Sequence, residues 1–180
     1  MGTLSGRTIL MVIASQQFRD EEYAVPRQLF EAAGALVTVA SSTLKPATGM
    51  LGMTAQADLL LNDVDPKRFD AVVFVGGMGA TEYWEDSTAH QIARRMTGDG
   101  KVAAAICLAP MTLANAGLLQ GRRATMWPSE AKAFQAKGVV YTGRPVEQDG
   151  LFITGSGPEA AEPFGRAVVK ALAAAPIRAS

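Results

Sequence analysis

Several short segments of the chain are almost continuously apolar and rich in Val, Ile and Ala. They are residues 9–14, 36–40, 71–75, 102–107 and 151–153. Strands that helices cover on both faces of a sheet have this composition, because neither face meets water. The pattern therefore predicts a sheet whose strands are buried on both sides.

Amphipathic helical patterns lie between these segments. Apolar residues recur at i, i+3, i+4 and i+7 over residues 89–96 and again over residues 161–172. Gly34, Gly117 and Gly138 each follow a helical stretch, where a left-handed C-cap ends a helix. The alternation of strand and helix predicts an α/β fold, a three-layer α/β/α sandwich around a mainly parallel sheet.

Residues 45–69 are less regular than the rest. Gly49 and Gly52, among alternating apolar residues, predict a short hairpin, and a polar connector follows at residues 62–67. We find no internal repeat and no linker. We therefore expect one domain over residues 1–180, with loose termini at residues 1–6 and 174–180.

The overall charge limits the class of partner. Basic and acidic side chains number 17 each, so the formal net charge is zero. No overall positive field attracts nucleic acid or an anionic membrane surface. No apolar stretch approaches the roughly 20 residues of a membrane-spanning helix. We expect a cytoplasmic protein that has a small-molecule substrate and neither a nucleic-acid nor a membrane partner.

The rarest residues exclude further classes of site. The chain has one cysteine, Cys107, and one histidine, His90. A single cysteine forms no internal disulfide, and these two residues fall short of the usual ligand set of a structural zinc site. We expect neither a bound metal nor a cofactor.

Cys107 lies where a buried strand turns into a helix. Functional groups of open parallel sheets collect at such carboxyl ends of strands. Small residues, Ala105 and Ala109, stand two positions on either side, as a sharp nucleophile elbow requires, and Pro110 suits the first helical turn. The positive end of the helix would lower the thiol pKa. The alternative is a small hydrophobic residue of the core.

Paired glycines follow another predicted strand, at Gly76 and Gly77. If this turn lies beside the cysteine, the N–H groups of Gly77 and Leu108 form an oxyanion hole with two donors. The alternative is an ordinary turn that needs a positive φ angle. The segment lacks the pattern of a phosphate loop.

An acidic cluster, Asp20, Glu21 and Glu22, begins a helical pattern that contains Pro26. Acidic residues at a helix start complement the helix dipole and need no other role. Pro26 would remove the N–H that bonds the carbonyl of Glu22 and leave that turn open. Glu22 is therefore a candidate inward-facing carboxyl, with a solvated charge as the alternative.

Together these features resemble the PfpI family of intracellular cysteine peptidases and deglycases. The resemblance covers nearly the whole chain and rests on four motifs: Glu22 four residues before Pro26, the glycine turn at residues 73–77, the elbow at residues 104–110, and the Gly-Ser-Gly-Pro segment at residues 155–158. It implies a flavodoxin-like sandwich and a homodimer or larger assembly. It also implies that Cys107 is the nucleophile and that Glu22 is hydrogen-bonded to it. A protonated Glu22 would donate to the sulfur and lower the thiol pKa, with the two groups titrating as a pair.

The chain departs from the family pattern at the base. Peptidase-like members carry a histidine directly after the cysteine, where this chain has Leu108, and other members bring one from the region where this chain has Trp127. We predict that His90 lies on a helix surface. Trp127 and the pair Tyr83 and Trp84 are candidates for an apolar wall, with core packing as the alternative.

These residues favour a cysteine-dependent enzyme that acts on a small electrophile, an α-oxoaldehyde or its adduct. Cys107 would attack the carbonyl, Gly77 and Leu108 would bind the oxyanion, and Glu22 would move the proton. The alternative is a non-enzymatic sensor of oxidative stress, or a chaperone, that uses the same cysteine. Hydrolysis of peptides or amides is disfavoured, because a poor leaving group needs a proton donor.

Overall fold

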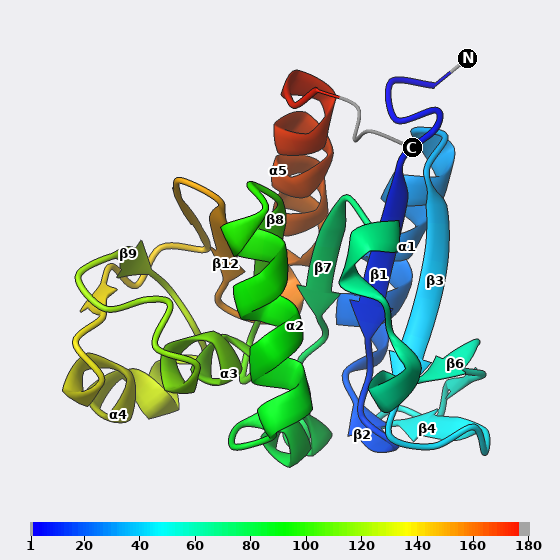
Figure 1. The fold of residues 1–180 in the computed structure, drawn as a ribbon. Coiled ribbons are helices and arrows are strands. Elements are labelled where there is room, and N and C mark those ends of the chain that lie inside the picture. The colour runs from blue at the N-terminus through cyan, green and yellow to red at the C-terminus, as the bar shows by residue number, and fades with distance from the viewer. Residues whose placement is uncertain (1, 177–180) are drawn as a thin grey trace.

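A seven-stranded sheet forms the centre of the molecule in a computed structural model that describes residues 2–176 (Figure 1). In spatial order its strands are β11 (Val146–Asp149), β12 (Phe152–Gly155), β8 (Val102–Ile106), β7 (Ala71–Phe74), β1 (Thr8–Val12), β3 (Leu36–Ser41) and β6 (Leu59–Leu60). Every neighbouring pair is parallel except β11 and β12. The predicted buried strands and the mainly parallel sheet are confirmed.

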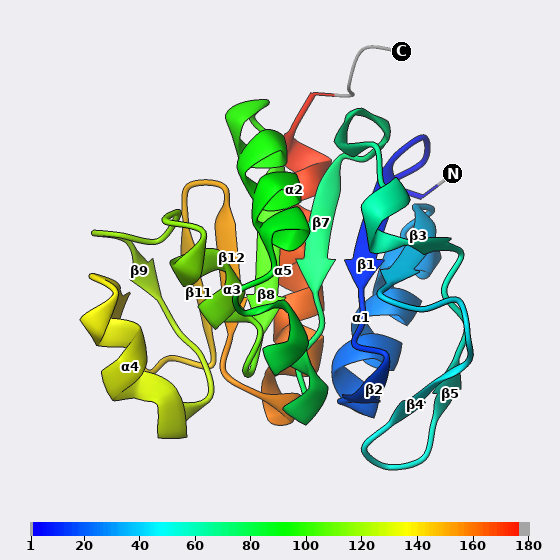
Figure 2. The ribbon, with the colours of Figure 1, turned by 60° about the horizontal axis from the view of Figure 1, so that its bottom comes forward.

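Helices cover both faces of this sheet (Figures 1 and 2). On one face lie α1 (Asp20–Ala32) and α5 (Ala161–Ala174), and on the other α2 (Ser87–Gly98) and α3 (Pro110–Asn115). α1 and α5 pack closely, because Gly165 has no side chain to hold them apart: a Cβ atom there would lie 3.1 Å from the Cα of Pro26. The predicted three-layer α/β/α sandwich, which is flavodoxin-like, is confirmed.

Two smaller sheets flank the central one. β2 (Gln16–Phe18), β4 (Ala47–Gly49) and β5 (Thr54–Ala55) form the first, which contains the predicted hairpin. Asp20 ties this hairpin to α1 by accepting the N–H groups of Leu51 and Met53 at 2.9 and 2.8 Å. The second sheet pairs β9 (Arg123–Ala124) with β10 (Val140–Tyr141), beside α4 (Ala131–Ala136).

Short 3-10 helices make several of the connections. They are η1 (Leu61–Asp63), η2 (Pro66–Arg68), η3 (Met78–Tyr83), η4 (Pro128–Glu130) and η5 (Pro158–Ala160). Of these, η3 and η5 follow β7 and β12 directly, at the carboxyl ends of the strands. The connections that carry the glycine motifs therefore meet at one edge of the sheet.

The termini differ from the expectation of loose ends. Leu4 is fully buried and donates its N–H to the carbonyl of Ala33 at 2.8 Å, so the described part of residues 1–6 is packed. At the other end the guanidinium of Arg7 donates to the carbonyls of Ala175 and Pro176. The rest of the predicted C-terminal tail, residues 177–180, lies outside the described residues, as does residue 1.

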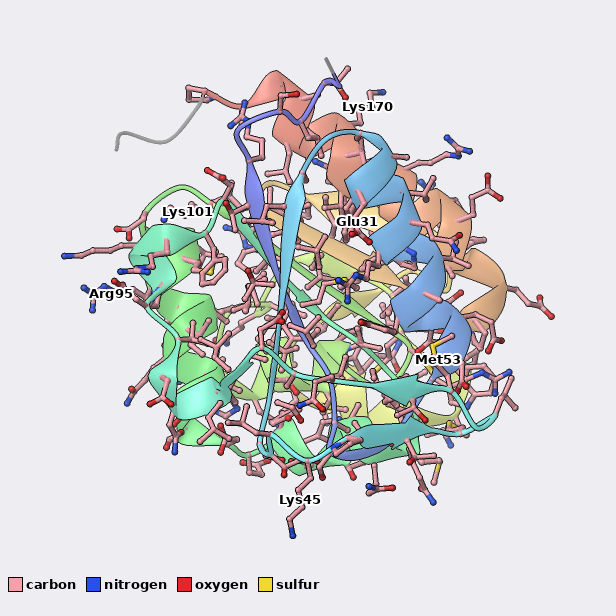
Figure 3. All side chains as sticks on the ribbon, turned by 90° about the vertical axis from the view of Figure 1, so that its right-hand side faces the viewer. Glu31, Lys45, Met53, Arg95, Lys101 and Lys170 are labelled. Carbon is pink, nitrogen blue, oxygen red and sulfur yellow. The ribbon has the colours of Figure 1, made fainter. Side chains whose placement is uncertain are left out.

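Charged side chains such as Lys45 and Arg95 extend away from the body of the molecule (Figure 3). The core is made of the apolar strand residues and the inner faces of the helices. Within residues 2–176, no helix is long and apolar enough to cross a membrane.

Candidate active site

Cys107 occupies a strained turn between β8 and α3. Its φ angle is 64°, in the left-handed region that residues other than glycine rarely adopt. Hydrogen bonds on both sides hold this conformation: the N–H of Cys107 donates to the carbonyl of Gly155, and its carbonyl accepts the N–H of Trp127, both at 2.9 Å. The predicted elbow is therefore present, and its strain is maintained by two neighbouring loops.

Glu22 lies in the first turn of α1 and is fully buried. Its carboxyl and Cys107 both lie against Gly76, where a Cβ atom would be 2.3 Å from Glu22 Oε1 and 2.6 Å from the Cβ of Cys107. Only glycine fits this position. The thiol of Cys107 and the N–H of Gly76 lie close enough to lower the pKa of Glu22. Neither reaches full hydrogen-bond geometry, so both carboxyl oxygens lack a fixed donor among the described residues.

Burial raises the pKa of Glu22 to about 8, against the lowering effects of Cys107, Arg19 and Gly76. Removal from water penalises the charged carboxylate more than the neutral acid. Glu22 is therefore protonated at neutral pH, in agreement with the sequence-based hypothesis of a neutral carboxyl beside the sulfur.

The expectation of a lowered thiol pKa is not met. Burial raises the pKa of Cys107 to about 12, and ionised Glu22 adds to the rise. The N–H groups of Gly77 and Leu108 oppose it. Cys107 is only 7% exposed, and its desolvation outweighs the favourable effect of the short helix that follows.

Gly77 and Leu108 both present their N–H groups to the sulfur of Cys107. Gly77 has a φ angle of 103°, and a Cβ atom there would lie 2.4 Å from the N atom of Arg19. Positive φ and close approach to the neighbouring loop both require glycine. The structure thus brings together all four predicted site residues, Cys107, Glu22, Gly77 and Leu108.

A hollow of about 670 Å³ is formed by residues that neighbour this site in the chain or hydrogen-bond to it, although none of the four site residues lines it. It is lined by Arg19, Glu21, Trp127, Pro128, Ser156, Gly157, Pro158 and Glu159. The indole ring of Trp127 packs against Gly157, where a Cβ atom would be 3.0 Å from the ring. Trp127 is therefore a wall of the hollow, as the sequence suggested, and its place next to Cys107 is fixed by its main-chain hydrogen bond.

Arg19 is a lining residue that the sequence analysis missed. Its guanidinium binds Glu21 with a shortest distance of 3.0 Å, and this pair raises the pKa of Arg19 and lowers that of Glu21. Its position directly before the acidic cluster was a usable signal, because a cation next to three acids forms an ion pair readily.

The prediction for His90 is wrong. His90 is on α2 but only 8% exposed, and its Nε2 atom lies 2.8 Å from the carbonyl oxygen of Trp84. The preceding connection folds over this part of α2 and covers the ring. Tyr83 is likewise buried, with its hydroxyl donating to the carbonyl of Ile13 at 2.7 Å. Tyr83 is therefore a core residue and does not line the hollow.

No group of three or more His, Cys, Asp or Glu side chains in residues 2–176 is arranged to hold a metal ion. The donor set around Cys107 is one carboxyl and main-chain N–H groups, so the chemistry available here is that of a thiol, a neutral acid and two amide donors.

Comparison with known proteins agrees with this geometry. The profile of the DJ-1/PfpI family matches residues 7–171. Among curated relatives, an uncharacterized protein of Methanocaldococcus jannaschii is 40% identical over 91% of this chain and 82% of its own length. The deglycase PfpI of Pyrococcus furiosus is 31% identical over 91% of this chain and 98% of its own. A ThiJ/PfpI domain protein from Brachyspira murdochii has a similar crystal structure, with a TM-score of 0.92, 32% identity and coverage of 96% and 99% of the two chains.

The raised pKa of Glu22 makes stability depend on pH. Its ordinary value is 4.5, and the folded value is about 8, so the folded state binds the proton more tightly. The contribution is present below the unfolded pKa and is lost as pH rises toward 8, by up to roughly 5 kcal/mol. The free energy of unfolding of Glu22→Gln, measured with urea, should therefore increase relative to that of the wild type as the pH rises from 5 to 8.5.

The control for this measurement is Glu162→Gln, which removes an exposed carboxyl on α5 that is paired with Arg166. Its stability difference from the wild type should stay nearly constant with pH, because surface pairs contribute little. Parallel pH curves for Glu22→Gln and the wild type would show that Glu22 is ionised in the folded protein.

Proposed function

This chain belongs to the DJ-1/PfpI family, and from that premise we propose that it is a cysteine-dependent enzyme that converts an α-oxoaldehyde or its adduct. The observation that carries the proposal is the convergence of Cys107, buried neutral Glu22 and two N–H donors at one elbow. Each group matches a need of carbonyl addition: a nucleophile, a proton carrier and stabilisation of the oxyanion. The name of the Pyrococcus furiosus relative, a deglycase, supports the same substrate class.

The first step is addition of the thiol to the aldehyde carbonyl. Sulfur forms a bond to carbon, the C=O double bond becomes a single bond, and the proton of the thiol reaches the oxygen. Glu22 is suited to move it, because a neutral carboxyl accepts a proton at one oxygen while it donates from the other. Both of its oxygens lack a fixed protein donor. The raised thiol pKa does not prevent this step, since the thiol proton is transferred during the attack.

The N–H groups of Gly77 and Leu108 stabilise the negative charge that develops on oxygen in the same step. They are fixed main-chain donors at a buried elbow, where hydrogen bonds to charge are stronger than in water. The carbon-bound hydrogen of the adduct then moves to the neighbouring carbonyl carbon, which oxidises one carbon, reduces the other and leaves a thioester of the hydroxy acid. Water cleaves the C–S bond, releases the acid and restores the Cys107 thiol, so the whole conversion adds one water molecule and needs no external oxidant or reductant. The hollow of about 670 Å³ beside Trp127 admits a small substrate or an adduct.

The two alternatives have less support. An oxidant-sensing cysteine needs thiolate character and exposure, whereas Cys107 is 7% exposed and burial raises its pKa to about 12. Peptide hydrolysis needs a base or acid for a poor leaving group. Leu108 and Trp127 stand where the family resemblance implies such a histidine, and the Nε2 atom of His90 is engaged by the carbonyl of Trp84.

The proposal predicts that Cys107 is required for turnover. Wild-type protein incubated with methylglyoxal should form lactate, followed by NMR, and Cys107→Ser should lose at least about a hundredfold of this rate, because a hydroxyl at the elbow is a much weaker nucleophile. Thermal unfolding of the variant serves as the folding control. Equal rates in the two proteins, or peroxide oxidation of wild-type Cys107 without any turnover, would contradict the proposal.

Glu22 should affect turnover and thiol labelling in opposite directions. Above pH 8 ionised Glu22 raises the pKa of Cys107, so replacing it with neutral Gln should speed labelling by iodoacetamide at pH 9 several-fold. The same Glu22→Gln variant cannot move a proton, and its turnover at pH 7 should fall by about a hundredfold or more. The control is Glu162→Gln, which should leave both rates unchanged. If Glu22→Gln left the labelling rate unchanged at every pH, the carboxyl of Glu22 would not interact with the thiol of Cys107, and the proposed role of Glu22 would be wrong.

A further inference from the structure

Trp84 makes a side-chain contact with the elbow that neither the family assignment nor the proposed mechanism uses. Its indole Nε1–H donates to the carbonyl oxygen of Leu108 at 2.8 Å. Trp84 directly follows η3 and is partly buried. The contact joins the connection after β7 to the residue that supplies one of the two proposed oxyanion donors.

The carbonyl of Leu108 lies just before α3 (Pro110–Asn115). In a continuous α-helix the N–H of Thr112, four residues later, would donate to it. The N–H of Ala109 donates to the carbonyl of Ile106, and the N–H of Thr112 donates to the carbonyl of Ala109. Among the described residues no main-chain N–H donates to the carbonyl of Leu108, so the indole N–H supplies the donor that this acceptor otherwise lacks.

The preceding peptide unit is fixed from its other side. The carbonyl of Cys107 accepts the N–H of Trp127 at 2.9 Å. In a trans peptide the N–H points opposite to the carbonyl, so the N–H of Leu108 is directed away from Trp127 and toward the sulfur of Cys107. Trp84 then fixes the next peptide unit and so limits rotation at Leu108 itself.

Trp84 is held in place by two further donors. His90 Nε2 and Asn115 Nδ2 lie 2.8 and 2.9 Å from the carbonyl oxygen of Trp84. A carbonyl oxygen only accepts hydrogen bonds, so His90 carries its proton on Nε2. The chain's only histidine therefore acts on the elbow through Trp84, at a distance from the reacting atoms.

We propose that Trp84, supported by His90 and Asn115, is the positioning residue of the oxyanion hole. The segment that holds η3 begins at Gly77, which supplies one donor, and ends at Trp84, which fixes the residue that supplies the other. One short connection thus sets the distance between both donors. The inference rests on the proposed function for its kinetic consequence, but the contact itself has an independent readout.

Trp84→Phe tests the proposal, because it removes the indole N–H and keeps a smaller aromatic ring in its place. Complete loss of one oxyanion donor lowers kcat by about 10²–10³-fold, and a donor that is only misaligned should lower it less, by about tenfold. We expect this fall in kcat for methylglyoxal with KM changed less than about twofold, since the oxyanion forms only in the transition state. The pH dependence of turnover should keep its midpoint, because Glu22 is untouched.

The matched control is Tyr83→Phe, one residue earlier. It removes a buried hydroxyl that donates to the carbonyl of Ile13 at 2.7 Å and accepts the N–H of Ser42 at 3.1 Å, but it does not touch the elbow. Both variants should lose thermal stability, and only Trp84→Phe should lose kcat. Equal kcat values in the two variants would overturn the positioning role.

Amide hydrogen exchange separates this inference from the proposed function. By NMR, exchange at Leu108 and Ala109 should be about tenfold faster in Trp84→Phe than in the wild type and unchanged in Tyr83→Phe. Absence of methylglyoxal turnover in the wild type together with this change in exchange would reject the proposed function and retain the contact. Unchanged exchange at both amides would overturn the inference whatever the enzyme does.

Discussion

Burial of one carboxyl against one thiol is the constraint on which the site depends. Glu22 is fully buried at the start of α1, and Cys107 sits in a left-handed turn after β8, and both side chains lie against the backbone of Gly76. An ionised carboxylate in this position would repel a thiolate and lose its hydration. The neutral acid avoids both penalties, so the fold selects the protonation state that proton transfer to a carbonyl oxygen needs.

This arrangement lowers the stability of the folded protein but places the groups that the proposed chemistry needs. Two buried carboxyl oxygens without a fixed donor and a cysteine with a φ angle of 64° are each unfavourable in isolation. They persist because the parallel sheet brings the ends of β1, β7, β8 and β12 to one edge, where their loops hydrogen-bond to each other. Functional sites commonly retain strain of this kind, since relieving it would remove the chemistry.

Much of this site was predictable from sequence because its signals are local. A cysteine between a strand of small residues and a proline, a pair of glycines after another strand, and a glutamate before a helical proline each have a steric reason that is visible in a few residues. The alternation of strand and helix patterns was sufficient to predict the three-layer sandwich with its mainly parallel sheet. The polar edge strand β11 escaped prediction because, with one side unpaired, it does not need an apolar run.

Other features depended on contacts between distant segments. His90 has the spacing of a surface position, and only the fold of the connection before α2 shows that its ring is covered and bound to Trp84. Burial also reversed the expected direction of the shift in the thiol pKa of Cys107. The local sequence indicates that a helix begins after the cysteine, but it does not indicate how deeply the cysteine is buried.

The most direct test is a titration of the Glu22 carboxyl itself, by NMR of carbon-13-labelled glutamate with assignment through Glu22→Gln. We expect a carboxyl that is protonated at pH 7 and titrates near 8, with the midpoint changed in Cys107→Ser because the two groups are coupled. A carboxyl that titrates near its ordinary value of 4.5 and ignores Cys107→Ser would contradict this expectation.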